Sequence, residues 1–347
     1  MKIRLLTLLL FAGHILSAQI TFIPDSIFEQ KLIDLNYDIF HDGWVITDSI
    51  NSIDSLDISS FNGQTDKITD LTGIEDFSNL QYLNCSNNKF DTLNLNNNQY
   101  LKHIICASDS IEVLMTDSLF SLDKLQCNSN NITELNLLGN PSLTELGCWD
   151  NQLDNLNLSN NIYLGYLNCG ENNITSLDVS MLDLYDLRCQ NNAISTINLD
   201  NNYSLEWLSC YNNNLQNINL TVNTNLIVLN VGNVSSQPSI YNNDLNSLDL
   251  SNNCNITTFY SKGNANLECI QVCDISAANN WNTQNIDTQH FFSNGCNYTA
   301  TNEGSERNQK IISIKDIYGR ESDIHTNSFL FYIYQNGRVK KRIILDN

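Results

Sequence analysis

The chain has 347 residues, of which 41% are hydrophobic and only 16% are charged, and its formal net charge is −21. The charge is uneven, because residues 19–306 hold seven Lys and Arg against 34 Asp and Glu, whereas residues 307–347 hold eight against four. An acidic body repels phosphates, which argues against a nucleic-acid partner. No stretch after residue 18 reaches the 18 apolar residues of a membrane span.

Residues 1–18 have the pattern of a signal peptide. A basic start is followed by an apolar run from Leu5 to Leu16, which is too short to cross a bilayer. The small residues Ser17 and Ala18 then precede the expected cleavage site before Gln19. We therefore expect the mature chain to be exported, and the alternative is a buried N-terminal helix.

Residues 19–50 are predicted to cap the open end of a core. Within residues 24–36, Asp25 or Ser26 is suited to begin a short helix, because apolar residues then follow at helical spacing. A repeated apolar pattern begins at residue 51, with an extra loop expected within residues 60–67.

Cysteine then recurs at a spacing of 21 residues, with one spacing of 20. A leucine lies five positions before each cysteine, a leucine or isoleucine lies two before it, and an Asn or Asp lies three after it. Seven registered copies indicate an internal repeat. The seven cysteines are Cys85, Cys106, Cys127, Cys148, Cys169, Cys189 and Cys210.

The repeat unit has the chemistry of a short strand followed by a bend. The apolar residue and the cysteine two positions later point to the same side of a strand, and stacked coils bury that side. Cysteine is expected there as a small apolar filler, and the Asn amide is expected to satisfy backbone groups at the bend. The second half reads L-x-L-x-x-N and is too short for an ordinary helix, so an extended return and few helices are expected.

The pattern L-x-x-L-x-C-x-x-N-x-(L/I/F) resembles the leucine-rich repeat, over residues 51–272. The resemblance implies a mainly β fold: a leucine-rich-repeat solenoid with a parallel sheet, a short N-terminal helical cap and a small C-terminal β domain. The three-residue steps from Ile68 to Leu80 resemble the internalin-like type of repeat, which implies a short helical or 3₁₀ return.

The repeat is expected to end in a cap. The frame breaks at a predicted loop, Gly232–Ser239, and resumes at Asn243. Leu267–Val272 is predicted to be the last strand, followed by a C-terminal cap over residues 273–298 and a linker over residues 299–307.

Residues 308–347 differ from the repeat because they are basic and rich in β-forming residues. Strands are expected at 310–314, 329–334 and 339–345. The segments 316–321 and 331–337 resemble the type A C-terminal sorting domain of type IX secretion cargo. The resemblance implies passage across an outer membrane, with the type IX secretion machinery as a partner. The alternative is a small β domain with a role of its own.

The cysteines are expected to be structural. The seven repeat thiols are predicted to be buried and inert. Cys254, Cys269, Cys273 and Cys296 allow three disulfide pairings in an exported chain. The caps of similar repeat proteins imply a Cys269–Cys296 disulfide, with Cys254–Cys273 as the second. The rival interpretation is a metal site of Cys269, Cys273, His290 and Cys296.

No catalytic constellation, phosphate-binding glycine loop or metal motif is present in the sequence, so no cofactor and no enzymatic activity are expected. The leading hypothesis is a secreted or cell-surface binding module with a protein or glycan ligand. The alternative is a structural or adhesive surface protein without a discrete ligand, and an enzyme with an unrecognised site is a third.

The ligand is expected on the concave sheet, where residues flanking the cysteines point away from the core. Exposed aromatic residues favour binding, although scattered surface aromatics are the alternative. Acids at 145, 150, 171 and 186 lie beside them in the repeat frame. The predicted ligand-binding residues are Tyr82, Trp149, Tyr166, Arg188, Trp207 and Tyr211.

Overall fold

The computed structural model describes residues 19–61, 63, 65–232 and 243–296, together with the backbone of three strands within residues 311–344. The chain divides into two compact units, Met1–Asn294 and Gly295–Asn347. The predicted signal peptide, the 299–307 linker and residues 233–239 of the predicted loop lie outside the described residues.

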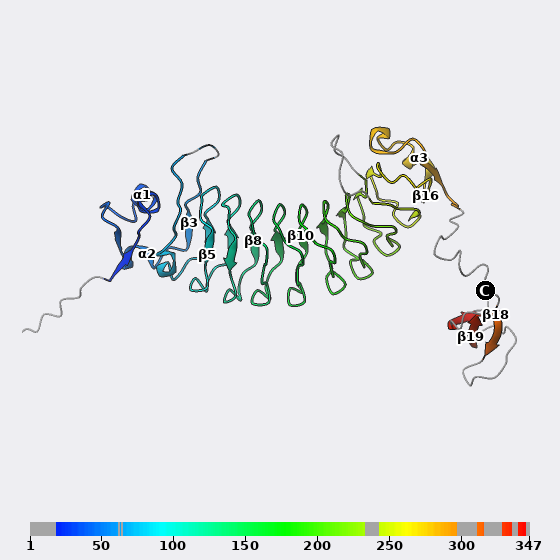
Figure 1. Ribbon diagram of the computed structural model, residues 1–347, viewed down its shortest axis with the longest axis horizontal. Helices are drawn as coiled ribbons and strands as arrows, with labels where there is room; N and C mark the ends of the chain where they lie inside the picture. The colour runs from blue at the N-terminus through cyan, green and yellow to red at the C-terminus, as the bar shows by residue number, and fades with distance from the viewer. Residues whose placement is uncertain are drawn as a thin grey trace, which may run out of the picture. The chain divides into compact units, whose positions relative to one another are not determined.

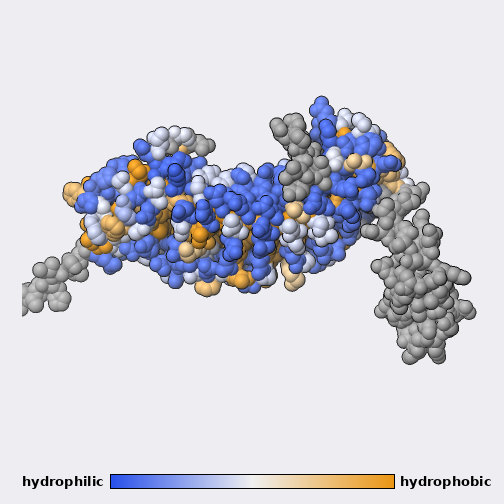
Figure 2. Space-filling view, in the orientation of Figure 1, coloured by the Kyte–Doolittle hydropathy of each residue, from blue (hydrophilic) through white to orange (hydrophobic). Residues whose placement is uncertain are grey.

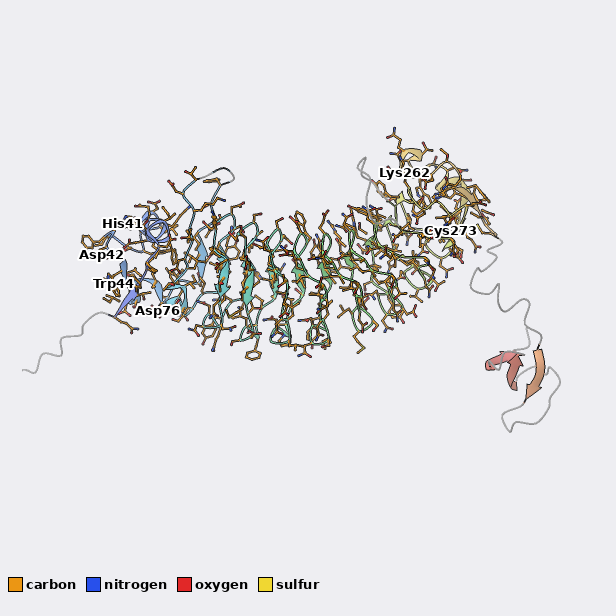
Figure 3. The ribbon with its side chains drawn as sticks, in the orientation of Figure 1. His41, Asp42, Trp44, Asp76, Lys262 and Cys273 are labelled. Carbon is orange, nitrogen blue, oxygen red and sulfur yellow. A yellow bond between two sulfur atoms is a disulfide. The ribbon has the colours of Figure 1, made fainter. Side chains whose placement is uncertain are left out.

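The N-terminal cap combines two strands and two short helices (Figure 1). Strands β1 (Ile20–Phe22) and β2 (Trp44–Ile46) pair antiparallel. Helix α1 (Ser26–Asp34) connects them, and helix α2 (Thr47–Ile50) comes after β2. The predicted helix is confirmed, with Asp25 as its N-cap accepting hydrogen bonds from two backbone N–H groups of the first turn. Figure 3 shows His41, Asp42 and Trp44 at this end of the repeat body.

The repeats form a solenoid whose coils each add one strand to a ten-stranded parallel sheet, as expected. Each strand of this sheet is three residues long, and its middle residue is buried. Neighbouring strands are in register, so that Leu146 lies beside Leu167. The strands are β3 (Ser55–Asp57), β4 (Tyr82–Asn84), β6 (His103–Ile105), β8 (Lys124–Gln126), β9 (Glu145–Gly147), β10 (Tyr166–Asn168), β11 (Asp186–Arg188), β12 (Trp207–Ser209), β13 (Val228–Asn230) and β15 (Thr258–Tyr260).

The seven repeat cysteines are free thiols that directly follow these strands and are buried. Burial disfavours the thiolate and raises the pKa of every one of them, that of Cys127 and Cys189 to about 12. A buried thiol with so high a pKa is a poor nucleophile and metal ligand. The seven therefore act as apolar filler of the core.

A second buried row, the asparagine ladder, closes the coils and lies three residues after each of the seven cysteines. In Asn151, Nδ2 donates to the carbonyls of Cys127 (3.0 Å) and Cys148 (3.1 Å), and Oδ1 accepts from the Ile132 backbone N–H (3.0 Å). One amide thus satisfies backbone groups of neighbouring coils, as the repeat predicts. The ladder consists of Asn88, Asp109, Asn130, Asn151, Asn172, Asn192, Asn213, Asn243 and Asn264.

The return half of the coils is extended, with few helical turns. A 3₁₀ turn, η1 (Ile74–Asp76), confirms the return expected from the three-residue steps. Strands β5 (Thr92–Asn94) and β7 (Val113–Met115) pair parallel, so a second sheet forms at this place. In the described coils from Gly139 to Gly232, the return segments form no strand.

The end of the repeat body differs from the prediction. The ten-stranded sheet ends at β15, where Ser261 takes the cysteine position: Asn264 donates to its carbonyl at 2.9 Å, as ladder residues do to the cysteines. The chain then continues into a return segment. Strand β16 (Cys269–Val272) therefore pairs with β14 (Leu248–Leu250) on the return side, and β17 (Phe291–Ser293) follows as one more parallel strand. Cys269–Val272 is not the last strand.

The C-terminal cap also contains α3 (Ile275–Ala278) and η2 (Thr283–Asn285). Two disulfides lie among the cysteines outside the ladder. Cys254 is bonded to Cys273, with their Cα atoms 5.7 Å apart; Figure 3 labels Cys273 in this cap. Cys269 and Cys296 are also disulfide-bonded, and their pairing with each other stays a prediction.

The second unit contains a three-stranded antiparallel sheet of β18 (Ile311–Lys315), β19 (Ser328–Tyr334) and β20 (Val339–Ile344). These three strands correspond to the three β segments expected from the sequence. No helix in the described part of the chain has the length and hydrophobicity that crossing a membrane requires.

Candidate ligand-binding face

The sheet face is the side of the ten-stranded sheet opposite the core. Because side chains alternate along a strand, the first and third residues of each strand lie on it. Most of them are partly exposed, and the buried ones are Gly147, Asp186, Ser209, Val228 and Asn230. Figure 2 shows a largely hydrophilic surface on the repeat body with scattered hydrophobic residues.

Three of the predicted residues form a stacked group on β10, β11 and β12. The Arg188 guanidinium lies over the Trp207 ring at 4.7 Å and near the Tyr166 ring at 5.8 Å from the ring centroids. Asp186 binds the same guanidinium through two contacts of 3.0 and 2.8 Å. Because residues i and i+2 share one face of a strand, this ion pair forms within β11 and covers the Asp186 carboxylate.

The arrangement makes the stacked group an ordered surface. The bidentate pair fixes the guanidinium plane, and cation–π contacts hold the two rings against it. The ion pair raises the pKa of Arg188. A partner that binds Trp207, which is 38% exposed, therefore contacts side chains that are already ordered. Binding then costs less conformational entropy.

The other predicted residues are distributed along the sheet face. Trp149 and Tyr211 directly follow Cys148 and Cys210, and their strands are separated by β10 and β11. Trp149 is 38% exposed and Tyr211 is partly buried. Tyr82 lies on β4, with β6 and β8 between it and β9, so it is separate from the others.

Tyr185, which the sequence analysis missed, also lies at this face. It precedes β11 and is 45% exposed. Its ring occupies space beside Gly165, where an added Cβ atom would lie 2.8 Å from a ring carbon. The signal was available in the sequence, because a glycine stands one coil before the tyrosine at the same repeat position.

The rival metal site is ruled out by the oxidation state of its cysteines. Cys269, Cys273 and Cys296 are disulfide-bonded and offer no thiolate. His290 is engaged otherwise: Nδ1 lies 2.9 Å from the Ser261 hydroxyl and Nε2 lies 3.3 Å from the Asn264 carbonyl. Burial lowers the pKa of this imidazole. No group of three or more metal-ligating side chains occurs in the described ranges.

A hollow of about 520 Å³ lies away from the sheet face, on the return side beside η1 and β5. Two of its carboxylates have local partners, because Asp70 accepts from the Thr72 backbone N–H at 2.8 Å and Glu75 accepts from that of Gly73 at 2.9 Å. The hollow lies where a coil with a 3₁₀ return meets a coil with an extended one. We assign it to this change of coil shape.

Solved structures contain counterparts of this architecture. The functional domain of InlJ from Listeria monocytogenes, which includes a cysteine ladder, is 24% identical with a TM-score of 0.53, and the match covers 80% of this chain and 72% of that one. The chain has the leucine-rich-repeat fold.

Two further solved structures share this fold. A leucine-rich-repeat protein from Leptospira interrogans is 20% identical with a TM-score of 0.56, over 71% of this chain and 62% of that one. A plant peptide hormone receptor in complex with RGF2 is 18% identical with a TM-score of 0.51, over 65% and 41%. No family model and no curated protein matches the chain.

Proposed function

We propose that this chain is a secreted or cell-surface binding module whose sheet face binds a protein or glycan ligand. The observation that carries the proposal is the stacked group of Tyr166, Arg188 and Trp207. Three large side chains are held in order on a solvent-exposed face, although no packing in the core requires them there. Aromatic and arginine side chains are the residues that dominate binding energy at interfaces.

The fold supports this proposal. A repeat solenoid offers an extended surface on which residues can vary without disturbing the core. Among the solved structures of this fold is a peptide hormone receptor in complex with RGF2. The proposed ligand-binding residues are Tyr82, Trp149, Tyr166, Arg188, Trp207 and Tyr211, and the proposal includes no catalytic activity.

A ligand array tests the proposal. The full chain would be applied to arrays of glycans and of proteins, with Trp207→Ala as the variant and Tyr203→Ala as the matched control. Tyr203 is 55% exposed and lies outside the sheet face. We expect a saturable ligand whose binding Trp207→Ala weakens by about 1 to 3 kcal/mol, with little effect of the control. Attachment of cells without any discrete ligand would favour the adhesive alternative.

The export route is a further part of the proposal. Disulfides are typical of proteins in oxidising compartments, which supports an extracellular location. We propose that residues 1–18 direct export and that residues 308–347 engage the type IX secretion machinery. Deletion of residues 308–347 is expected to leave a folded repeat body that does not reach the cell exterior. Normal surface delivery of the truncated chain would refute this route.

A further inference from the structure

Short turns form the edge of the repeat body that precedes the sheet strands. Each turn leads from the return half of one coil into the next strand, and six successive turns precede β6, β8, β9, β10, β11 and β12, which are neighbours in the sheet. The turns lie along the lower edge of the repeat body in Figure 1, where Figure 2 shows hydrophobic residues at intervals. They comprise residues 96–101, 117–122, 138–143, 159–164, 180–184 and 200–205.

Large apolar side chains on these turns form a row, the turn-edge stripe. Five of the six turns contribute to it, and the turn before β9 exposes Leu138 and Pro141 in the same row. Every side chain of the stripe is more than half exposed, from 53% for Ile162 to 73% for Met181. Successive coils are about 4.8 Å apart, so these side chains form one continuous surface. The stripe consists of Tyr100, Phe120, Ile162, Tyr163, Met181 and Tyr203.

The fold does not require apolar residues on these turns. A buried asparagine holds most of them: Asn140, for example, donates from Nδ2 to the carbonyls of Thr116 (2.9 Å) and Leu119 (3.1 Å) in the preceding coil. The residue after the asparagine is exposed, and it is Tyr203 in one coil but Thr224 in the next. A polar residue therefore serves the turn equally well, and the stripe needs an explanation other than folding.

The exposed area of the stripe is that of one side of a protein interface. Six large side chains that are more than half exposed present on the order of 700 Å², because an aromatic side chain has about 150 to 250 Å² to bury. The largest apolar patch of a typical monomer is about 300 to 600 Å². One partner of a standard interface buries about 800 Å². On the sheet face, by contrast, Trp149 and Trp207 are each 38% exposed.

The stripe carries little charge, although the chain has a net charge of −21. The six turns contain no Lys or Arg and only three carboxylates, each of which accepts a hydrogen bond from a neighbouring coil. A basic partner therefore finds little to attract it, whereas a second copy of this acidic chain meets the least repulsion at this edge. Depletion of charge with enrichment of aromatic residues and Met is typical of interface cores. The donors are Asn136 Nδ2 to Asp117, the Ser204 backbone N–H to Asp183 (2.8 Å) and Asn219 Nδ2 to Asp200 (3.1 Å).

The stripe has a similar order of side chains from either end. A tyrosine lies on each outermost turn, Phe and Met lie on the next turns inward, and Pro and Ile lie on the two central turns. An isologous interface requires a surface that complements itself in this way. Tyr–Tyr and Met–aromatic contacts are also favourable in themselves. From the first turn to the last, these residues are Tyr100, Phe120, Pro141, Ile162, Met181 and Tyr203.

We propose that the turn-edge stripe is the interface of a two-fold dimer of this chain, in which the two stripes run antiparallel. Tyr100 of one copy then lies against Tyr203 of the second copy, and Phe120 lies against Met181. The inference goes beyond the proposed function, because the stripe lies outside the sheet face and leaves that face of both copies open to ligand. A dimer would offer two such faces and would gain avidity for a repeated or surface-bound ligand.

The test is sedimentation velocity of the full chain over a range of micromolar concentrations. The variant is Phe120→Ser, and the matched control is Phe40→Ser in the N-terminal cap, because the two rings are 65% and 64% exposed. We expect the native chain to dimerise with increasing concentration. Phe120→Ser should raise the dimer dissociation constant at least about 10-fold, since a two-fold interface contains each residue twice, and Phe40→Ser should change it less than about twofold.

Cysteine cross-linking tests the antiparallel arrangement. Tyr100 and Tyr203 are five coil spacings apart in one chain, or about 24 Å. A short bismaleimide should therefore join Tyr100→Cys chains to Tyr203→Cys chains in a mixture, and should join neither variant to itself. The ladder thiols are buried and should not react in the folded chain.

Two results would overturn the inference: a monomer at every concentration, or equal weakening of the dimer by Phe120→Ser and Phe40→Ser. A monomer that binds phosphatidylcholine vesicles, and loses this binding in Phe120→Ser, would assign the stripe to a lipid surface instead. Cross-linking of Tyr100→Cys chains to one another would contradict the antiparallel arrangement. Thermal unfolding of each variant checks that the fold is retained.

Discussion

On the buried side of the ten-stranded sheet, successive coils repeat the same residues. Leucine or isoleucine is at most strand centres, cysteine follows the strand in seven coils, and the asparagine ladder closes the coil. On the sheet face of the same strands the residues change from coil to coil, from Lys124 to Glu145, Tyr166, Asp186 and Trp207. Because the coils stack, the buried side chains of each coil must fit those of its neighbours. The side chains on the sheet face contact solvent and are free to differ from coil to coil.

We therefore expect the buried side to determine stability and the sheet face to determine ligand binding. Substitutions that interrupt the buried repetition should unfold the chain more easily. Substitutions on the sheet face should leave stability nearly unchanged and alter binding.

The largest effect is expected when an Asn→Ala substitution on the buried side is compared with the same substitution on the sheet face. Asn151→Ala removes the amide that serves the Cys127 and Cys148 carbonyls and the Ile132 N–H. It should destabilise the chain by about 1 to 3 kcal/mol, because buried backbone groups lose their partners. Asn168→Ala, on the partly exposed sheet face, should cost less than about 0.5 kcal/mol. The urea denaturation midpoints of the two variants are compared. Equal midpoints would contradict the different roles of the two sides.

A pH-dependent effect of similar size is expected at Asp109, the one carboxyl in the asparagine ladder. It is fully buried, and its Oδ1 accepts from the Asn88 backbone N–H at 2.5 Å, whereas Oδ2 has no partner in the described ranges. Burial raises its pKa from 3.8 to about 7. Folding therefore takes up a proton between these two values, so this residue's contribution to stability is present below pH 4 and is lost as the pH rises to about 7.

Asp109→Asn should restore the ladder and remove this pH dependence. The new amide can donate to the coil carbonyls at every pH, as the other ladder residues do. We expect the variant to be about 1 to 3 kcal/mol more stable than the native chain at pH 8, with a much smaller difference at pH 4. Urea midpoints at both pH values measure this. If the native chain loses no stability relative to the variant between pH 4 and pH 8, ionisation of Asp109 has no free-energy cost, which would contradict this prediction.

The smallest effect is expected from thiol reagents on the folded chain. The seven ladder cysteines are buried with raised pKa values, so none should react at pH 8 under native conditions. Seven thiols should react after unfolding, because the remaining four cysteines are in disulfides. Rapid native reaction of any ladder thiol would contradict its role as filler.

Most of the fold was predictable because the buried side repeats. The spacing of Leu83, Cys85 and Asn88 recurs in each copy and directly specifies strand, core and bend. The end of the sheet was not predictable in the same way. Ser261 stands where a cysteine would mark the coil, and the segment predicted to be the last strand, Leu267–Val272, instead pairs on the return side and is followed by β17.

The location of the candidate site was predictable, but only some of its contacts were. The repeat frame places Trp207 and Arg188 on one face of adjacent strands. The Arg188–Asp186 pair follows from their positions two residues apart on one strand. Side-chain packing decides the remainder: Gly165 is visible in the sequence one coil before Tyr185, but the placement of the Tyr185 ring beside it follows from how the coils stack.

The division between the two sides is tested most directly by measuring stability and binding on the same variants. Trp149→Ala and Trp207→Ala should each keep the urea midpoint within about 0.5 kcal/mol of the native chain and weaken a ligand found on the array by about 1 to 3 kcal/mol. Loss of stability with unaltered binding in both variants would contradict the account, because it would make the sheet face a structural surface.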